Sequence, residues 1–234
     1  MASLPENTRI YAVGDIHGRA DLLADLLRQI EADDKSRRPM ASRLIFLGDY
    51  VDRGPDSHGV IEMLLHDLPV HMARDFLMGN HERMLLDAIA DDAVMPLWLV
   101  NGGGAAVQSY ARAARERGEA VGPWRDVGDL IPAEHWAFFD ALQLQVSYGG
   151  YAFVHAGVRP GIGLAEQDPH DLLWMREPFL SYSGDFGKVV VHGHTPLEAP
   201  ELRDNRIGID TGAIFTGCLT ALVLEGDRLS LLST

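Results

Sequence analysis

Cysteine, positive charge and long apolar runs are all scarce in this chain, and each shortage excludes a class of protein. Cys218 is the single cysteine among 234 residues, so no disulfide can form within the chain. No apolar run approaches the roughly 20 residues that a membrane-spanning helix requires. The first residues also lack the basic and apolar segments of a secretory signal. We therefore expect a cytoplasmic protein that does not bind membranes.

The shortage of positive charge limits the possible partners. The chain has 20 Lys and Arg against 34 Asp and Glu, which gives a formal net charge of −14 at pH 7. Such an acidic surface repels the phosphates of nucleic acids and anionic membranes, so we expect neither as a partner. A phosphoprotein or small phosphoester substrate would need local positive charge, which metal ions and a few arginines can supply. The sequence does not indicate an oligomeric state.

Linkers, internal repeats and low-complexity segments are absent as well. The hydrophobic fraction of 47% and the charged fraction of 23% are ordinary for a globular protein. We therefore expect a single domain over residues 1–234, with one sizeable core.

The most informative stretch that is present lies at residues 48–54, Gly-Asp-Tyr-Val-Asp-Arg-Gly. It follows the short apolar run 43–47, which reads as a buried strand, and precedes Pro55 and Asp56, which suit a helix start. The carboxylates of Asp49 and Asp52 suit hard divalent cations, and the Arg53 guanidinium suits phosphate oxygens. Taken alone, the stretch could equally be a charged turn with a local ion pair.

The same design recurs after other predicted strands. In each case an apolar run ends in Asp, Asn or His beside glycine: Asp15 and His17 follow 9–13, Asn80 and His81 follow 70–77, His155 follows 151–154, and His194 follows 189–191. Each of these residues alone is more often structural. In α/β sheets, however, ligands bind beyond the carboxyl ends of the strands. We therefore expect the five strand ends to form one metal site.

The ligand types narrow the choice of metal. Mixed carboxylate, amide and imidazole donors suit manganese, iron or zinc better than calcium. The donors outnumber the needs of one four-coordinate ion, so we expect two divalent ions. Asp49 is the best candidate for a shared carboxylate that would hold them ~3.5–4 Å apart, a spacing used in phosphoester hydrolysis.

Hydrophobic periodicity predicts an α/β fold of two packed mixed β-sheets flanked by helices. Strands alternate with helices over the first third of the chain, including a helix at 21–30 with Asp21 as its N-cap and one that starts at Ser57. Hairpins are predicted at 144–154 and 219–232. Residues 83–143 read as a mainly helical insertion that caps the site. Within it, Asn101-Gly102-Gly103-Gly104 lacks the Lys-Ser/Thr of a P-loop and is predicted to be a tight turn.

Together, the blocks resemble a known family. GDIHG, GDYVDRG, GNHE, HAG and HGHT occur in that order, and the sequence is similar to the calcineurin-like metallophosphoesterases, in particular their phosphoprotein-phosphatase branch. WLVNGGG, LLWMRE and IDTGAIFTGCLT extend the resemblance to serine/threonine phosphatases of the bacteriophage lambda type. The similarity spans roughly residues 9–224 and implies the family's sandwich of two mixed sheets flanked by helices.

The resemblance also implies roles for individual residues. Asp15, His17 and Asp49 would hold one metal ion, and Asp49, Asn80, His155 and His194 the other. Arg53 and Arg176, helped by Asn80, would bind the phosphate. His81 would be the general acid, oriented by Asp52. A hydroxide that bridges the metals, most suitably manganese with iron or zinc as alternatives, would attack phosphorus in line, without a covalent phosphoenzyme.

Three positions qualify these expectations. Met78 stands where many relatives carry arginine before GNHE, which makes the substrate inferred from them less secure. His192 suits a packing role or support of a metal ligand, and Asp210 either orients a ligand imidazole or caps a turn. The runner-up activity is hydrolysis of dinucleoside polyphosphates such as diadenosine tetraphosphate, although Asp52 favours a phosphomonoesterase. A non-enzymatic scaffold would have lost metal ligands, and none is missing.

Overall fold

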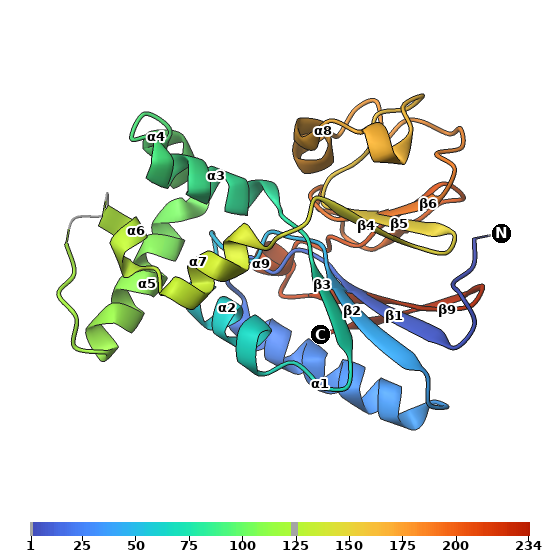
Figure 1. Cartoon of the computed structure of the whole chain (residues 1–234), viewed down its shortest axis with the longest axis horizontal. Coiled ribbons are helices and arrows are strands. Elements are labelled where there is room, and N and C mark those ends of the chain that lie inside the picture. The colour runs from blue at the N-terminus through green and yellow to red at the C-terminus, as the bar shows by residue number, and fades with distance from the viewer. Residues whose placement is uncertain (1, 123–125) are drawn as a thin grey trace.

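Two five-stranded β-sheets pack face to face, and a group of helices extends beyond one end of them (Figure 1). The computed structural model describes residues 2–122 and 126–234. The first sheet has the order β10-β9-β1-β2-β3. Strands β1, β2 and β3 run parallel, with β3 at one edge, and β9 and β10 are antiparallel additions on the other side of β1. The bounds are β1 Thr8–Val13, β2 Ala41–Phe46, β3 Ala73–Phe76, β9 Thr220–Glu225 and β10 Arg228–Ser233.

The second sheet has the order β4-β5-β6-β8-β7 and is also mixed. Strands β5, β6 and β8 run parallel, and the β4–β5 hairpin turns at Gly149-Gly150 as predicted. The bounds are β4 Gln145–Tyr148, β5 Tyr151–Val154, β6 Val189–His192, β7 Glu201–Leu202 and β8 Arg206–Gly208. The predicted fold class, two packed mixed sheets with helices outside, is confirmed.

Strand β1 shows why its sequence is apolar at consecutive positions. Ile10 and Ala12 face the core between the two sheets, whereas Tyr11 and Val13 face the core between the first sheet and its helices. All four side chains are fully buried. A strand that is covered on both faces has no polar side. Because its side chains pack into both cores, its register relative to the neighbouring strands is fixed, and so is the position of the loop that follows it.

Helices α1 (Ala20–Ser36), α2 (Ser57–His66) and α3 (Asn80–Ala90) follow the first three strands. The predicted start of α2 is confirmed, because the Asp56 side chain accepts a hydrogen bond from Gly59 N at 3.2 Å. The predicted N-cap at Asp21 is wrong: Arg19 occupies that position and Asp21 lies in the first turn.

Two predicted boundaries also differ from the structure. Helix α1 continues to Ser36 instead of ending at residue 30, because contacts outside the helix hold its polar last turns: Tyr11 donates to Asp33, and Arg9 donates to Asp34. Strand β3 covers 73–76 instead of 70–77, and Val70 is exposed.

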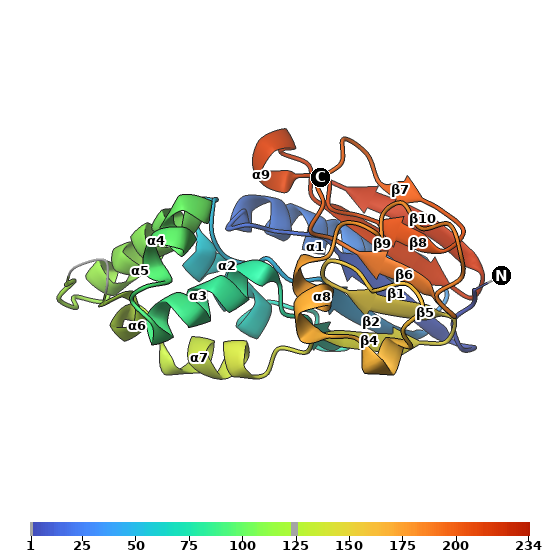
Figure 2. The same ribbon diagram turned by 90° about the horizontal axis from the view of Figure 1, so that it is seen from above.

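The insertion predicted at residues 83–143 is mainly helical where the structure describes it. It contains the end of α3, α4 (Met95–Trp98), a π-helical turn (Leu99–Gly103), α5 (Gly104–Glu116), α6 (Val127–Leu130) and α7 (Ala133–Asp140). These helices project beyond the end of the sandwich in both views (Figures 1 and 2). The tight turn predicted at 101–104 is instead part of this π-helical turn, which bends at Gly102 with φ 113°.

Shorter helices complete the chain: the 3₁₀ turn η3 (Leu164–Glu166), α8 (Pro169–Trp174) and α9 (Ala213–Thr216). No helix among the described residues is long and apolar enough to cross a membrane.

Candidate active site

The structure brings the candidate side chains together at the carboxyl ends of strands from both sheets. Asp15 and His17 follow β1, Asp49 and Asp52 follow β2, and His155 and His194 follow β5 and β6, whereas Asn80 and His81 open α3. All eight are buried, with exposed fractions of 9% or less. The two arginines, Arg53 and Arg176, are exposed.

Backbone strain is concentrated at this site. Six non-glycine residues in the described ranges have positive φ, and five of them are candidate site residues: His17 (47°), Asp49 (51°), Asp52 (69°), Arg53 (64°) and His194 (64°). Such conformations cost of order 1–3 kcal/mol each and persist only where the surroundings enforce them. The fold therefore sacrifices stability here to aim these side chains.

Glu82 is the buried residue that holds the loop after β2 in place. Its Oε2 accepts hydrogen bonds from the N–H groups of Asp49 (2.8 Å) and Gly79 (2.9 Å), and its Oε1 accepts from Tyr50 (2.8 Å) and Val51 (3.1 Å). One carboxylate thus ties the start of α3 to the loop that carries Asp49 and Asp52. Burial and the negative charge of Asp49 raise the pKa of Glu82 to about 8.

Asn80 lies between two imidazole rings. Its Oδ1 is 2.9 Å from His155 Nε2 and 2.8 Å from His194 Nδ1, and His155 Nε2 is 3.4 Å from Asp49 Oδ1. His155 donates its Nδ1–H to Leu47 O at 2.8 Å, and burial lowers its pKa, so the neutral ring turns a lone pair at Nε2 toward these oxygens. Lone pairs that converge in this way are suited to a shared cation.

A second group of donors shares Asp49. His17 donates Nδ1–H to Val51 O at 3.0 Å, which leaves Nε2 pointing toward Asp49 Oδ2 at 3.5 Å. Asp15 lies beside them: its Oδ2 accepts from His194 N at 3.0 Å, but its buried Oδ1 has no hydrogen-bond partner among the described residues. An unpaired buried carboxylate oxygen is costly unless a cation or water completes it.

These distances fit metal coordination. Two ligands at right angles on an ion with bonds of about 2.1 Å lie about 3 Å apart. Asp49, His155 and His194 bring one donor atom each within 4.8 Å of one another, and so do Asp49, His17 and His81. The two donor groups that share Asp49, together with the unpaired oxygen of Asp15, fit divalent cations.

The electrostatics favour the metal-binding forms of Asp49, His17 and His194, whereas burial and the charges of Asp210 and Asp49 raise the pKa of Asp15 well above its usual value. Burial alone would raise the pKa of Asp49, but His155, His81, His17 and His194 lower it below its usual value. Burial lowers the pKa of His17 and of His194 to about 3. Asp49 is therefore ionised, and both rings are neutral, at any pH near 7.

His81 and Asp52 form a buried pair beside the donor groups. His81 Nδ1 donates to Asp52 Oδ2 at 2.7 Å, and its Nε2 lies 4.0 Å from Asp49 Oδ2. Burial by itself would lower the pKa of His81, but the charges of Asp49 and Asp52 raise it above the ordinary histidine value. The ring can therefore hold a proton whose N–H faces the donor groups.

The two arginines are less firmly held. Arg53 Nη1 donates to His17 Nε2 at 2.9 Å, so the guanidinium reaches the donor groups directly. The pKa of His194 is lowered by burial, by His155 and, to a smaller extent, by the charge of Arg176.

The three qualifying positions have defined surroundings. Met78 lines a mostly apolar hollow of about 480 Å³ with Leu142, Leu144, Leu173 and Trp174, and Arg83, Asp87 and His170 also line it. His192 packs edge-on against Phe179, with ring centroids 4.9 Å apart, which matches the packing role. Asp210 Oδ1 accepts a hydrogen bond from Gly212 N at 2.9 Å. This contact matches the predicted role as a turn cap, rather than the alternative role of orienting a ligand imidazole.

Sequence reasoning missed the roles of Glu82 and Trp98. No role was predicted for Glu82, although its position three residues after Gly79 suits a side chain that folds back onto backbone N–H groups. The Trp98 indole donates to Asp52 Oδ2 at 2.8 Å across 46 residues of sequence. No local pattern signals that second contact.

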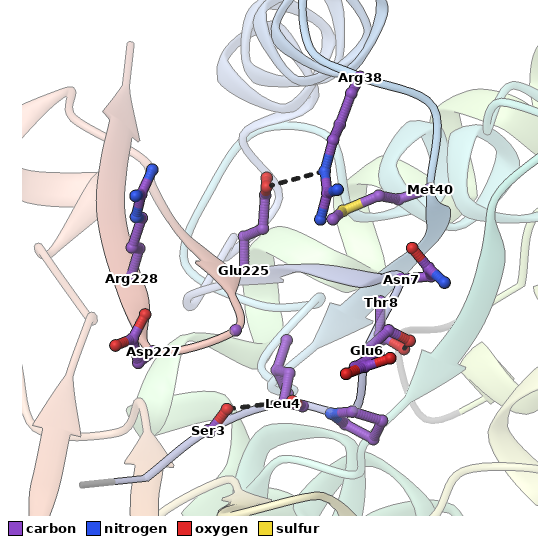
Figure 3. A pocket seen from close by; sticks show the side chains of 12 residues that line it. Ser3, Leu4, Glu6, Asn7, Thr8, Arg38, Met40, Glu225, Asp227 and Arg228 are labelled. Carbon is purple, nitrogen blue, oxygen red and sulfur yellow. Dashed lines mark hydrogen bonds and ion pairs between the residues drawn. The ribbon is translucent and has the colours of Figure 1, made fainter.

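A larger hollow, of about 710 Å³, lies at the opposite end of the first sheet, where β1 and β2 begin and β9 turns into β10 (Figure 3). Glu225 in its lining is paired with arginines of the chain itself: its Oε1 lies 3.8 Å from Arg38 Nε, and its Oε2 lies 3.0 Å from Arg9 Nη2. None of the candidate site residues lines it, so we place the chemistry at the carboxyl ends of the strands.

Comparisons with known proteins agree with this geometry. Residues 8–216 match the family described as calcineurin-like phosphoesterases, so the chain belongs to that family. It is a metal-dependent phosphoric ester hydrolase, and the family together with the donor groups implies divalent metal ions.

Particular relatives differ in their names. A serine/threonine-protein phosphatase 1 of Salmonella typhimurium is 31% identical, with 90% of this chain and 89% of that protein covered. A bis(5'-nucleosyl)-tetraphosphatase PrpE of Halalkalibacterium halodurans is 29% identical over 90% of this chain and 87% of its own length. A crystal structure provisionally assigned as a diadenosine tetraphosphatase has a TM-score of 0.69 at 22% identity, covering 100% of this chain and 98% of its own. That likeness supports the fold.

Proposed function

We propose that this chain is a phosphomonoesterase that uses two divalent ions, preferably manganese with iron or zinc as alternatives, and hydrolyses phosphoserine and phosphothreonine in proteins. The named serine/threonine phosphatase relative supports this substrate class. The acidic net charge of −14 supports the absence of nucleic acid among its partners. A cytoplasmic location remains a prediction from the sequence.

The observation that carries the proposal is the buried hydrogen bond from His81 Nδ1 to Asp52 Oδ2 at 2.7 Å. Serine and threonine alkoxides are poor leaving groups and need a proton as the P–O bond breaks, which a positioned acid provides. Cleavage of a phosphoanhydride releases a phosphate oxygen, which is stable without that proton. A built proton donor therefore favours alkyl phosphomonoesters over dinucleoside polyphosphates.

Each residue then has a role in the proposed reaction. A water oxygen loses a proton to solvent and bonds to phosphorus, the P–O bond to the alcohol breaks in line, and the leaving oxygen takes the proton from His81 Nε2. The ring then regains a proton from solvent. Asp52 keeps the ring oriented, Arg53 and Arg176 neutralise the phosphate, and Asn80 helps to bind it. Asp15, His17 and Asp49 would hold one ion, and Asp49, Asn80, His155 and His194 the other. When bound, the ions would activate the water and spread the charge of the transition state.

Hydrolysis of dinucleoside polyphosphates is the second candidate, and one observation favours it. The apolar hollow at Met78 is bounded by Trp174, whose ring lies 6.3 Å from the ring of His194. A nucleobase could enter this hollow while its phosphate chain reached the donor groups. The PrpE relatives support this reading.

The test is the ratio of kcat/KM for a phosphoserine peptide to that for diadenosine tetraphosphate, at matched manganese and ionic strength. The proposal predicts a preference for the peptide. A preference of about a hundredfold or more for the dinucleotide, about 2.7 kcal/mol of transition-state binding, would make the second candidate correct.

A further inference from the structure

The helical insertion reaches the His81–Asp52 pair through one side chain. Trp98, in α4, is fully buried, and its Nε1–H donates to Asp52 Oδ2 at 2.8 Å. The same oxygen accepts from His81 Nδ1 at 2.7 Å. Asp52 is itself fully buried, and its other oxygen, Oδ1, has no hydrogen-bond partner among the described residues. The orientation of this carboxylate therefore depends on the two donors at Oδ2.

The glycines that follow Trp98 bring the insertion into contact with the same loop. Gly102 has φ 113°, which side chains rarely adopt, and its carbonyl oxygen accepts from Arg53 N at 3.1 Å. A Cβ on Gly102 would lie 2.6 Å from Arg53 Cγ, and a Cβ on Gly103 would overlap the indole ring of Trp98. The glycine run thus lets the insertion lie directly against Asp52 and Arg53.

We propose that Trp98, seated by Gly102 and Gly103, is a positioning residue for the general acid. It acts through Asp52: the indole fixes the carboxylate rotamer, and the fixed carboxylate aims His81 at the leaving oxygen. The helical insertion is then a component of proton transfer as well as a cover for the cleft. This inference rests on the proposed function, because it gives His81 the acid role.

The physical reason is that water cannot replace the indole. Trp98 and Asp52 are both inaccessible to solvent, so loss of the N–H leaves the buried carboxylate with one donor and freer to rotate. Mutation of a residue that orients a metal ligand through a hydrogen bond typically costs tenfold to a hundredfold in activity, and we expect a loss of similar size for this orienting contact. The loss falls on substrates that need the acid, since the metal donors and the arginines are untouched.

The experiment compares two substrates with different leaving groups in Trp98→Phe. We expect kcat for an alkyl phosphate such as phosphoserine peptide to fall about tenfold to a hundredfold, with little change in KM. For p-nitrophenyl phosphate, whose leaving group needs no proton, kcat should stay within about threefold. Trp136→Phe, the same ring change in α7 away from Asp52, is the matched control and should show no dependence on the leaving group.

Two further arms keep the test decisive. Gly103→Ala keeps Trp98 but pushes its indole aside, so this variant should show the same dependence on the leaving group. It replaces Trp98→Phe in the test if Trp98→Phe does not fold. In an Asp52→Asn background, Trp98→Phe should have no further effect, because the two residues act in series.

Equal losses on both substrates, or additive losses in the double variant, would overturn the inference and leave the phosphatase proposal standing. A wild-type protein that hydrolyses neither phosphomonoester would instead contradict the proposed function.

Discussion

The two ends of the first sheet treat buried charge in opposite ways. At the amino end, Arg9 is fully buried, and its guanidinium donates to Glu225 Oε2 (3.1 Å), Asp34 Oδ1 (2.7 Å) and Arg38 O (3.0 Å). At the carboxyl end, Asp15 and Asp52 each keep a buried oxygen without a partner among the described residues. The strained non-glycine residues also lie mainly at the carboxyl end.

This difference in how buried charges are paired distinguishes residues that stabilise the fold from residues suited to binding a ligand. A buried charge that the chain satisfies itself contributes to folding, and its surroundings need no ligand. Buried donors that converge and stay incomplete destabilise the free protein and gain their partner on binding. The polar hollow of Figure 3 lies beside the first kind of charge, although its volume is larger than that of the hollow near the metal donors. Buried polar atoms that lack a hydrogen-bond partner are therefore a better guide to the site than the volume of a cavity.

The largest expected effect is the loss of the shared carboxylate. Asp49→Asn should lower kcat by more than about 10³-fold, because bound metal supplies several kcal/mol to the transition state. Elemental analysis of protein purified without chelator should show two ions in the wild type and fewer in the variant. Asp75→Asn, an aspartate paired with Arg43 on the first sheet, is the control and should keep both ions.

A wild type that never exceeds one ion per chain would contradict the dinuclear centre. A variant that keeps two ions would remove Asp49 from the bridging role.

The next effect concerns the proton donor. His81→Asn should lower kcat for alkyl phosphates by about 10²–10⁴-fold, the usual contribution of a positioned acid, with little change in KM. Aryl phosphates with good leaving groups should lose much less. His66→Asn, an exposed histidine on α2, serves as the control for the same change of ring to amide. Equal losses on both substrate types would show that His81 serves another purpose, such as metal binding.

The convergence of the candidate metal ligands could be predicted from sequence because a local pattern indicates it. Asp15, Asp49 and His155 each follow an apolar strand and adjoin or precede glycine, and the topology of parallel strands brings such ends together. The sheet order was open from sequence, but alternation of strands and helices restricted it to the α/β class.

The contacts that hold these donors could not be predicted in the same way. Glu82 acts on backbone N–H groups more than thirty residues away, and the Trp98 indole meets Asp52 only because the insertion folds back. The extension of α1 to Ser36 likewise depends on Tyr11 and Arg9 in β1. Long-range contacts of this kind override local propensity and leave no periodic signal in the sequence.

At the amino end, the expected effect is on stability alone. Arg9→Met breaks a buried ion pair and leaves Asp34 and Glu225 without their partner, which should lower the free energy of unfolding by about 3 kcal/mol. Urea unfolding measures this change. The kcat per folded molecule should equal that of the wild type, because no donor of the metal site contacts Arg9. A fall in kcat without a fall in the free energy of unfolding would contradict the claim that the amino end of the sheet serves stability and not activity.

The smallest expected effect is a pH dependence of the free energy of unfolding of the metal-free protein, which arises at the carboxyl end of the first sheet and not at the amino end. Glu82 has a folded pKa of about 8 against an ordinary value of 4.5, so the folded state binds its proton more tightly than the unfolded state does. Its contribution to stability is therefore complete below about pH 4.5 and is lost as the pH rises through about 8. His81, whose pKa is also raised, acts in the same direction.

Between about pH 6.5 and pH 8 this loss amounts to roughly 1.5 kcal/mol for Glu82, obtained by integrating the proton linkage. His17 and His194 do not oppose it there, because their lowered pKa values keep them neutral when folded, and most unfolded histidine is neutral above pH 6.5. Urea unfolding of chelator-treated protein should show the decline, and Glu82→Gln should remove the part of it that Glu82 contributes. Arg9→Met should keep it, since its ion pairs lie at the other end. Added manganese should abolish the decline, because cations favour the ionised carboxylates. If the stability of the wild type does not change with pH in this window, the buried carboxyl groups of the site are already ionised without metal.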